Sequence, residues 1–238
     1  MDRLDSLELP AQTVAASDEG LRVFMRGIFN LMTGALVVSG STAWLTAAIL
    51  GPALKGGLLP IIFALTPLAF VLVMSFGIHR LSYATANMVF WLFAASMGLS
   101  LSSIFVTYTG TSIASVFFIS AATFATASIL GYTTKRDLTN MGTFLMVGLI
   151  GILIAGIVNI FLASSALAFA ISVIGVIVFV GLTAYDTQNL KNDYLTNGSV
   201  YGFDSPQKSA LFGALSLYLN FINIFQMLMS LLGVRSDD

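Results

Sequence analysis

The chain has 238 residues, of which 57% are hydrophobic and only 9% charged, and its formal net charge is −1. A soluble domain carries about a quarter of its residues as charged side chains, so most of this surface must face lipid rather than water. The near-zero charge argues against a nucleic-acid partner, and the absence of cysteine excludes disulfides and thiolate metal sites.

The N-terminal segment is polar. Its first 20 residues hold five of the eleven acidic residues and lack the basic start and apolar core of a cleavable signal peptide. We therefore predict a polar cytoplasmic segment over residues 1–26 and a membrane domain over residues 27–234. The first apolar helix of that domain is expected to act as an uncleaved insertion signal.

Seven stretches of the membrane domain are long and apolar enough to cross a bilayer, whose core of about 30 Å requires about 20 helical residues. They are residues 28–50, 58–78, 83–105, 112–132, 141–162, 166–185 and 210–232. The links between most of them are short, which makes consecutive helices antiparallel. The predicted fold class is an all-α integral membrane protein, a bundle of seven transmembrane helices.

The third stretch carries many small and hydroxyl-bearing residues. Such residues let helix backbones approach closely in lipid, and they can also line a polar path. The pattern favours packing over a path. The residues are Ser96, Gly98, Ser100, Ser102 and Ser103.

The distribution of Lys and Arg predicts the orientation, because cytoplasmic links carry an excess of positive charge. With a cytoplasmic N-terminus, the outer side holds only Lys55 and Arg235, and the inner side holds eight basic residues. Those eight are Arg3, Arg22, Arg26, Arg80, Lys135, Arg136, Lys191 and Lys208. We therefore predict that the N-terminus is cytoplasmic and, with seven spans, that the C-terminus lies outside.

Three segments in this order resemble the bacterial branch of the Bax inhibitor-1 family of transmembrane proteins. They are Gly131–Leu138 followed by Met141 and Gly142, then Ala184–Gln188, and then Ala214–Phe225. Each is weak alone, but the three at these spacings are specific. The resemblance covers nearly the whole chain.

The resemblance implies six helices around a central seventh helix and a pH-sensitive leak for calcium, gated near the cytoplasmic helix ends. In that family a carboxylate on the sixth helix pairs with one on the seventh, and an arginine at the end of the second helix latches to them. Asp186 matches the first carboxylate and Arg80 the arginine. Asn220 stands where the family pattern has an aspartate, so this chain departs from its family at the implied gate.

Asp186 is also singled out by the residues themselves. It is the one acidic residue at the edge of a predicted span that has no adjoining basic residue. A carboxylate within the membrane costs about 2.5–3.5 kcal/mol on insertion scales, so it usually faces a partner or water. Either Asp186 pairs with Arg80, or it caps its helix in the headgroup region. Asp186 would also be the transient contact for a passing cation.

Replacing one carboxylate of a pair by an amide changes the expected pH response. Two carboxylates in contact share a proton and can sense pH near neutrality. The amide of Asn220 can instead donate to ionised Asp186 and favour its charged form. We expect a proton response that is weaker, or shifted to lower pH, than in relatives with two aspartates.

The sequence favours one of three classes of function. A pH-sensitive calcium or cation leak channel, gated near Asp186 with Arg80 as latch, is favoured. Because the spans offer one carboxylate, its flux should be slow and poorly selective.

The resemblance also implies an alternative, which is a regulatory protein without a channel that modulates a membrane-bound ATP-dependent protease or the protein translocation channel. The N-terminal tail is the segment that would carry this role. An enzyme is not expected, because aspartyl chemistry needs a second carboxylate and no nucleophile or metal-ligand motif is present. No cofactor is expected. The expected partners are membrane lipid and cations, and the expected location is a bacterial inner membrane.

Overall fold

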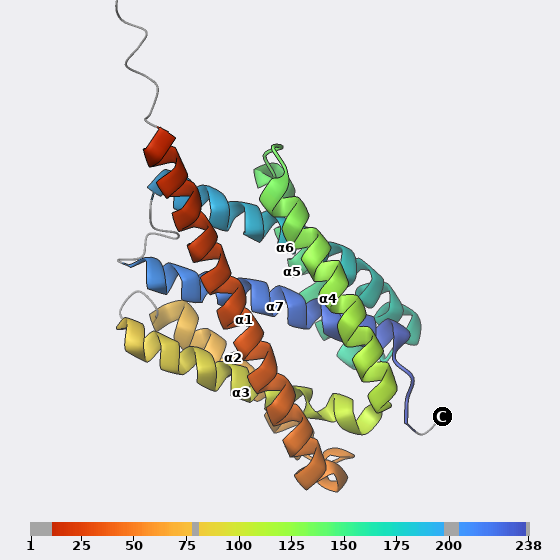
Figure 1. Ribbon diagram of the computed structural model, residues 1–238. Coiled ribbons are helices and arrows are strands. Elements are labelled where there is room, and N and C mark those ends of the chain that lie inside the picture. Colours follow the sequence, from red (N-terminus) through yellow and green to blue (C-terminus); the bar gives the residue numbers. More distant parts are fainter. Residues whose placement is uncertain (1–10, 78–80, 198–204, 237–238) are drawn as a thin grey trace, which may run out of the picture.

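The computed structural model describes residues 11–77, 81–197 and 205–236. This part of the chain forms seven α-helices in sequence order (Figure 1). They are α1 (Ala11–Leu54), α2 (Leu59–Gly77), α3 (Tyr83–Thr107), α4 (Gly110–Thr133), α5 (Thr139–Leu162), α6 (Ser165–Asn197) and α7 (Pro206–Leu232). Six of them are long and apolar enough to cross a membrane, whereas the apolar stretch described in α2, Leu59–Phe70, is shorter. The count of seven spans therefore stays a prediction.

Short polar side chains begin several helices where the sequence changes from link to apolar stretch. Ser82, Thr109 and Ser205 precede α3, α4 and α7, and the hydroxyl of each accepts a hydrogen bond from the backbone N–H three residues later. These bonds satisfy amide groups that the first helical turn leaves unpaired. Pro206 follows at the start of α7, where its missing N–H costs nothing.

Two helices extend more than ten residues beyond the predicted spans. α1 begins at Ala11 rather than near residue 28, so the polar lead-in and the first span form one continuous helix of 44 residues. The sixth span was predicted to end at Tyr185, and α6 continues beyond that residue to Asn197. No glycine or proline lies between these two residues, so nothing in the sequence breaks the helix there. Asp186 is consequently an interior residue of α6.

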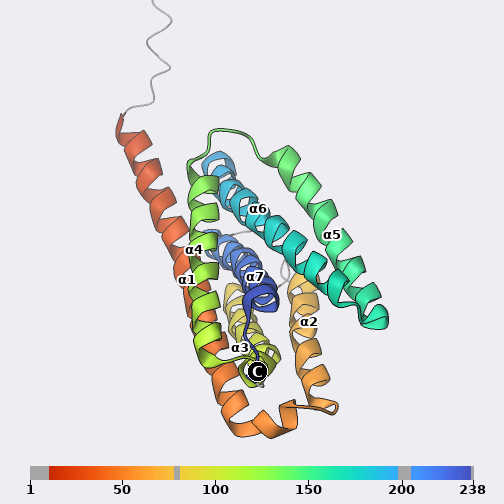
Figure 2. The same ribbon diagram turned by 90° about the vertical axis from the view of Figure 1, so that its right-hand side faces the viewer.

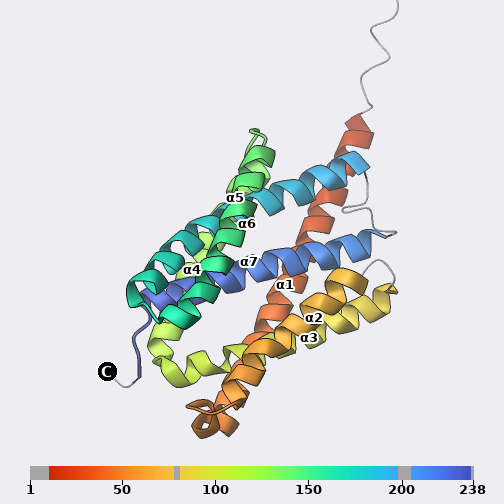
Figure 3. The same cartoon turned by 180° about the vertical axis from the view of Figure 1, so that it is seen from behind.

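The last helix lies inside the bundle. Of the most apolar window of α7, 56% is buried inside the protein, against 11% for α5. α7 packs against α1, α3, α4 and α6, whereas α2 packs on α3 and α1, and α5 packs on α6 (Figures 2 and 3). The arrangement differs from a complete ring of six helices around α7, because neither α2 nor α5 packs against α7.

The small residues of α3 serve packing. A methyl group added at Gly98 would overlap the backbone oxygen of Ser39 on α1 and the side chain of Thr42. The hydroxyls of Ser96 and Ser102 donate to carbonyls of their own helix, three residues earlier. The prediction that Gly98 permits close helix packing is confirmed, and the close approach brings α1 to α3 over much of its length.

Candidate functional site

Asp186 joins α6 to α7. Its side chain is partly buried, and its oxygen Oδ2 accepts two hydrogen bonds from α7. The hydroxyl of Ser216 donates at 2.6 Å, and the amide nitrogen of Asn220 donates at 2.8 Å. Both donors sit on one face of α7 because residues four apart in a helix lie one above the other. The result is a polar contact between two apolar helices.

The structure places the predicted site residues unequally. Asn220 lies against Asp186, and it is 6% exposed. Arg80, the predicted latch, lies outside the described residues, so its pairing with Asp186 stays a prediction. The idea that Asp186 caps its helix is wrong, since α6 continues well beyond it to Asn197.

Sequence reasoning missed Ser216. The signal was present, because Ser216 precedes Asn220 by four residues and therefore shares its face of α7. A serine in an apolar helix is easily attributed to close packing, since it often satisfies its hydroxyl with a carbonyl of its own helix. Only the position of Asp186 across the interface shows that its hydroxyl serves another helix.

A second buried polar contact joins three helices deeper in the bundle. The hydroxyl oxygen of Ser39 on α1 lies 2.7 Å from the backbone oxygen of Ala94 on α3 and 2.7 Å from the hydroxyl of Tyr218 on α7. It also lies 2.8 Å from its own helix at the oxygen of Ala35. Ser39 has a single hydroxyl hydrogen, and carbonyls can only accept. Tyr218 must therefore donate to Ser39 while Ser39 donates to a carbonyl, which fixes the direction of the chain.

The link between α4 and α5 is held by Gln188, which follows Asp186 by two residues on α6. The side-chain oxygen of Gln188 accepts from the N–H of Leu138 at 2.8 Å, and its amide donates to the oxygen of Arg136 at 2.8 Å. Gln188 is 5% exposed, so these bonds are shielded from water. Sequence reasoning gave this residue no role beyond its place in a motif.

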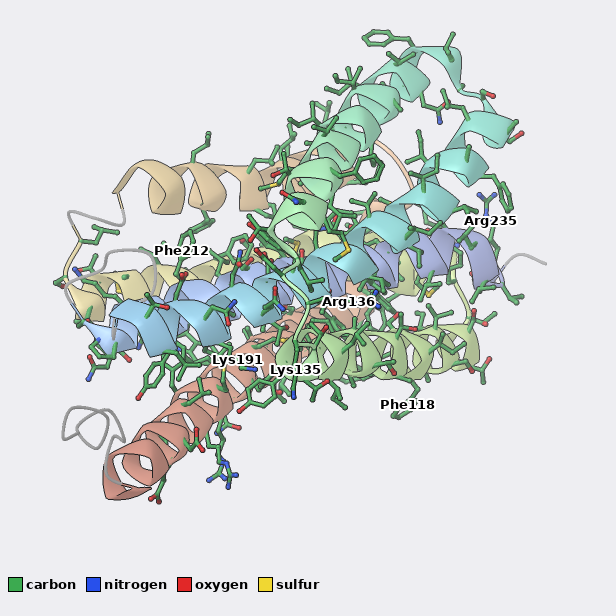
Figure 4. The ribbon with its side chains drawn as sticks, turned by 90° about the horizontal axis from the view of Figure 1, so that it is seen from above. Phe118, Lys135, Arg136, Lys191, Phe212 and Arg235 are labelled. Atoms are coloured by element: carbon green, nitrogen blue, oxygen red, sulfur yellow. The ribbon has the colours of Figure 1, made fainter. Side chains whose placement is uncertain are left out.

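Lys191, three residues after Gln188 on α6, also contacts the end of α4. Its ammonium group donates to the oxygen of Tyr132 at 2.8 Å and lies 5.2 Å from the centre of the Tyr132 ring. Figure 4 shows Lys191 and Lys135 close together at one end of α4, with Phe118 toward the other end. The basic residues of the link and of α6 therefore gather at one end of the bundle.

The first two segments that carry the family resemblance meet in space. A methyl group at Gly131 would overlap the backbone of Ala184, and one at Gly142 would overlap the ring of Tyr185. Glycine is required at these two places because the helices of the first and second segments approach too closely for a side chain. The close approach presses α6 against α4 and α5 at the two residues that precede Asp186.

The described residues bring together no group of three or more side chains of the types that usually hold a metal ion. A cation that reached Asp186 would meet one carboxylate and the neutral side chains of Ser216 and Asn220. Calcium usually takes six to eight oxygen ligands, so this arrangement suits a passing contact rather than a tight site.

The helices and their surfaces define a class of protein. α5 exposes large apolar side chains along its length, and Phe161 is 84% exposed. Large apolar side chains therefore cover the outer surface, and the side chains of Asp186 and Asn220 pair inside the bundle. This is an all-helical integral membrane protein.

The chain belongs to the Bax inhibitor-1 family. Residues 21–237 match the family described as "Inhibitor of apoptosis-promoting Bax1". The chain is 43% identical over 221 residues to the inner membrane protein YbhL of Escherichia coli K12, with 91% of this chain and 93% of YbhL covered. It is also 43% identical over 239 residues to an uncharacterized protein of Caulobacter vibrioides, with 94% of each chain covered.

Proposed function

We propose that this protein is a pH-sensitive calcium or cation leak channel of the Bax inhibitor-1 type, with a gate formed by Asp186, Asn220 and Ser216. The observation that carries the proposal is the pair of hydrogen bonds from α7 to one carboxylate oxygen of Asp186. These bonds hold the buried central helix against α6. A family resemblance in three segments that meet around this contact supports the same assignment.

The gate responds to pH through the charge of Asp186. When the carboxylate is ionised, the donors of Ser216 and Asn220 make charge-assisted hydrogen bonds, which are stronger than neutral ones. Protonation removes the charge, and the contact between α6 and α7 weakens. Flux should therefore increase as the pH falls through the range in which Asp186 takes up a proton. Arg80, at the end of the second span, would add a latch on the ionised form.

The decisive experiment compares calcium flux into liposomes across a pH series for the wild type and Asn220→Asp. Two adjacent carboxylates share a proton, so the midpoint of the pH response should move to higher pH by about one unit or more. Asn223→Asp is the matched control, because Asn223 lies on the same helix but donates to Leu219 of that helix. Superimposable curves for the wild type and Asn220→Asp would remove Asn220 from the gate.

Asp186→Asn completes the test. Without a titratable group at this position the pH response should flatten, whatever the absolute flux. An unchanged pH response in Asp186→Asn would place the sensor elsewhere, and no calcium flux from the wild type under any condition would refute the leak itself.

The alternative function is regulation of a membrane-bound ATP-dependent protease or of the protein translocation channel. Its support is the polar N-terminal segment, whose last part belongs to α1, a helix that continues without a break into the bundle. A partner that held this segment would act directly on the packing of α1. Deleting residues 2–17, and measuring calcium flux and protease association separately, distinguishes the two functions: the leak requires flux to survive the deletion, and regulation requires association to be lost.

The proposed topology has seven spans, a cytoplasmic N-terminus and a location in a bacterial inner membrane, as the name of YbhL states for that relative. The chain lacks cysteine, so single cysteines can be introduced and labelled without background. Gly56→Cys, in the link after α1, should react with a membrane-impermeant maleimide from outside the cell. Lys135→Cys should react only after the membrane is permeabilised. The reverse pattern would invert the proposed orientation.

A further inference from the structure

α1 and α4 border a groove that opens along the side of the bundle. The two helices do not pack against each other in the described chain, although both pack against α7, which crosses behind them in Figure 1. Three adjoining cavities of about 350, 380 and 530 Å³ follow the groove. The first two share Phe29 and Ser128, and the last two share Phe117 and Phe221. We call this feature the α1–α4 groove.

The two ends of the groove differ in charge. Arg22, Arg26 and Tyr132 line its first cavity. Both arginines are exposed, and neither forms an ion pair within the part of the chain that the structure describes. Asp18 and Glu19 precede them on α1 but line none of the three cavities. The first cavity therefore presents positive charge to a ligand, while the other two are almost entirely apolar.

One buried hydroxyl in the groove lacks a partner. Ser128 is 4% exposed and lines the first two cavities, and its Oγ is the one buried side-chain polar atom, among the described residues, without a hydrogen bond. A buried polar group without a partner costs about 1–3 kcal/mol, so it calls for a ligand that supplies an acceptor. Ser128 precedes Tyr132 by four residues on α4, so it lies about 6 Å farther from the charged end of the groove.

We propose that the α1–α4 groove binds an anionic diacyl phospholipid. Its phosphate contacts Arg22 and Arg26, an ester carbonyl accepts from the hydroxyl of Ser128, and an acyl chain lies between Phe29 and the aromatic side chains deeper in the groove. The dimensions fit, because the ten residues from Arg26 to Leu36 span about 15 Å, half of a bilayer core of about 30 Å. The phosphate, the ester and the chain thus follow the order in which the groove presents charge, hydroxyl and apolar surface.

The binding is tested by native mass spectrometry of the detergent-purified protein, titrated with dioleoyl phosphatidylglycerol or with dioleoyl phosphatidylcholine. The anionic lipid should bind more tightly, and Arg22→Gln/Arg26→Gln should weaken its binding by about 30-fold. The control Lys55→Gln/Arg235→Gln removes the same charge beyond the opposite ends of α1 and α4 and should leave binding unchanged. Equal binding of the two lipids, or equal losses in the two double variants, would overturn the proposal.

Ser128→Ala isolates the ester contact. It should weaken binding of the diester lipid by about two- to tenfold and leave binding of a diether phosphatidylglycerol unchanged, because the ether has no carbonyl. Ala125→Trp, which fills the groove, should abolish binding, whereas Ala122→Trp, exposed on the same helix but outside the three cavities, should not. If Ser128→Ala affected ester and ether lipids equally, or if Ala125→Trp retained the lipid, the groove would not be the site.

Discussion

The contact between Asp186 and Asn220 can be measured as a coupling free energy. The perturbation is a double-mutant cycle made of Asp186→Ala, Asn220→Ala and the variant with both changes. A hydrogen bond to a charged group contributes about 1.5–3 kcal/mol, whereas bonds between neutral groups of membrane helices average about 0.6 kcal/mol. At 2.8 Å the Asn220–Asp186 bond has good length, so the coupling at pH 8 should exceed about 1.5 kcal/mol if Asp186 is ionised.

The assay is the free energy of unfolding in bicelles, measured by steric trapping for the four proteins of the cycle. The same cycle with Ser216→Ala should give a comparable coupling, since its hydroxyl donates to the same oxygen at 2.6 Å. Both couplings should decline toward the neutral value when the pH is lowered, because protonation removes the charge. Couplings within about 0.5 kcal/mol of zero lie inside the error of such cycles and would refute the contact.

Three further predictions follow from contacts outside this site. Gln188→Ala should lower the free energy of unfolding by about 2–4 kcal/mol, because it leaves two shielded backbone groups without partners, and thermal unfolding in detergent measures this loss. Gly131→Ala should lower the free energy of unfolding by at least about 2 kcal/mol, because the added methyl group would overlap the backbone of Ala184. Gly151→Ala should change it by less than about 1 kcal/mol, because the added methyl group meets open space. Hydrogen bonds from the side chain and backbone of Thr139 hold the pKa of Asp137 below its usual value, so the stability that they add is present above the usual pKa and is lost as the pH falls through the lowered one. A carboxyl-carbon NMR titration should show this pKa rising in Thr139→Val, and an unchanged titration would refute the contact.

Sequence reasoning found most of the helices because hydropathy is a local property. The observed bounds of α3, α4 and α5 lie within a few residues of the predicted spans 83–105, 112–132 and 141–162. The difference between the predicted end of the sixth span and the end of α6 has the same origin. The apolar stretch ends near Tyr185, but helix propensity continues to Asn197, so the membrane signal and the helix end at different residues.

The candidate site was predictable only in part. Asp186 stands out in the sequence, and the family pattern pointed to Asn220, but Ser216 and Gln188 look like ordinary residues of their helices. Their roles depend on what lies across the interface, and a single sequence does not contain that information. The unpartnered hydroxyl of Ser128 is an extreme case, since it is defined by the absence of a neighbour in the described structure.

The sequence by itself determined that the chain belongs in a membrane, approximately where its helices lie and which carboxylate needs a partner. Each of these follows from the free-energy cost of placing polar groups in lipid, which depends on the type of each residue and can therefore be read from the sequence. Only the tertiary structure decided that α7 packs on four helices, that Ser216 and Asn220 both donate to Asp186, and that α1 and α4 leave a groove between them. The physical reason is that apolar side chains are as stable against lipid as against another helix, so the hydrophobic effect does not decide which helices pack together. Helix packing in lipid depends instead on complementary shape and on hydrogen bonds between distant segments.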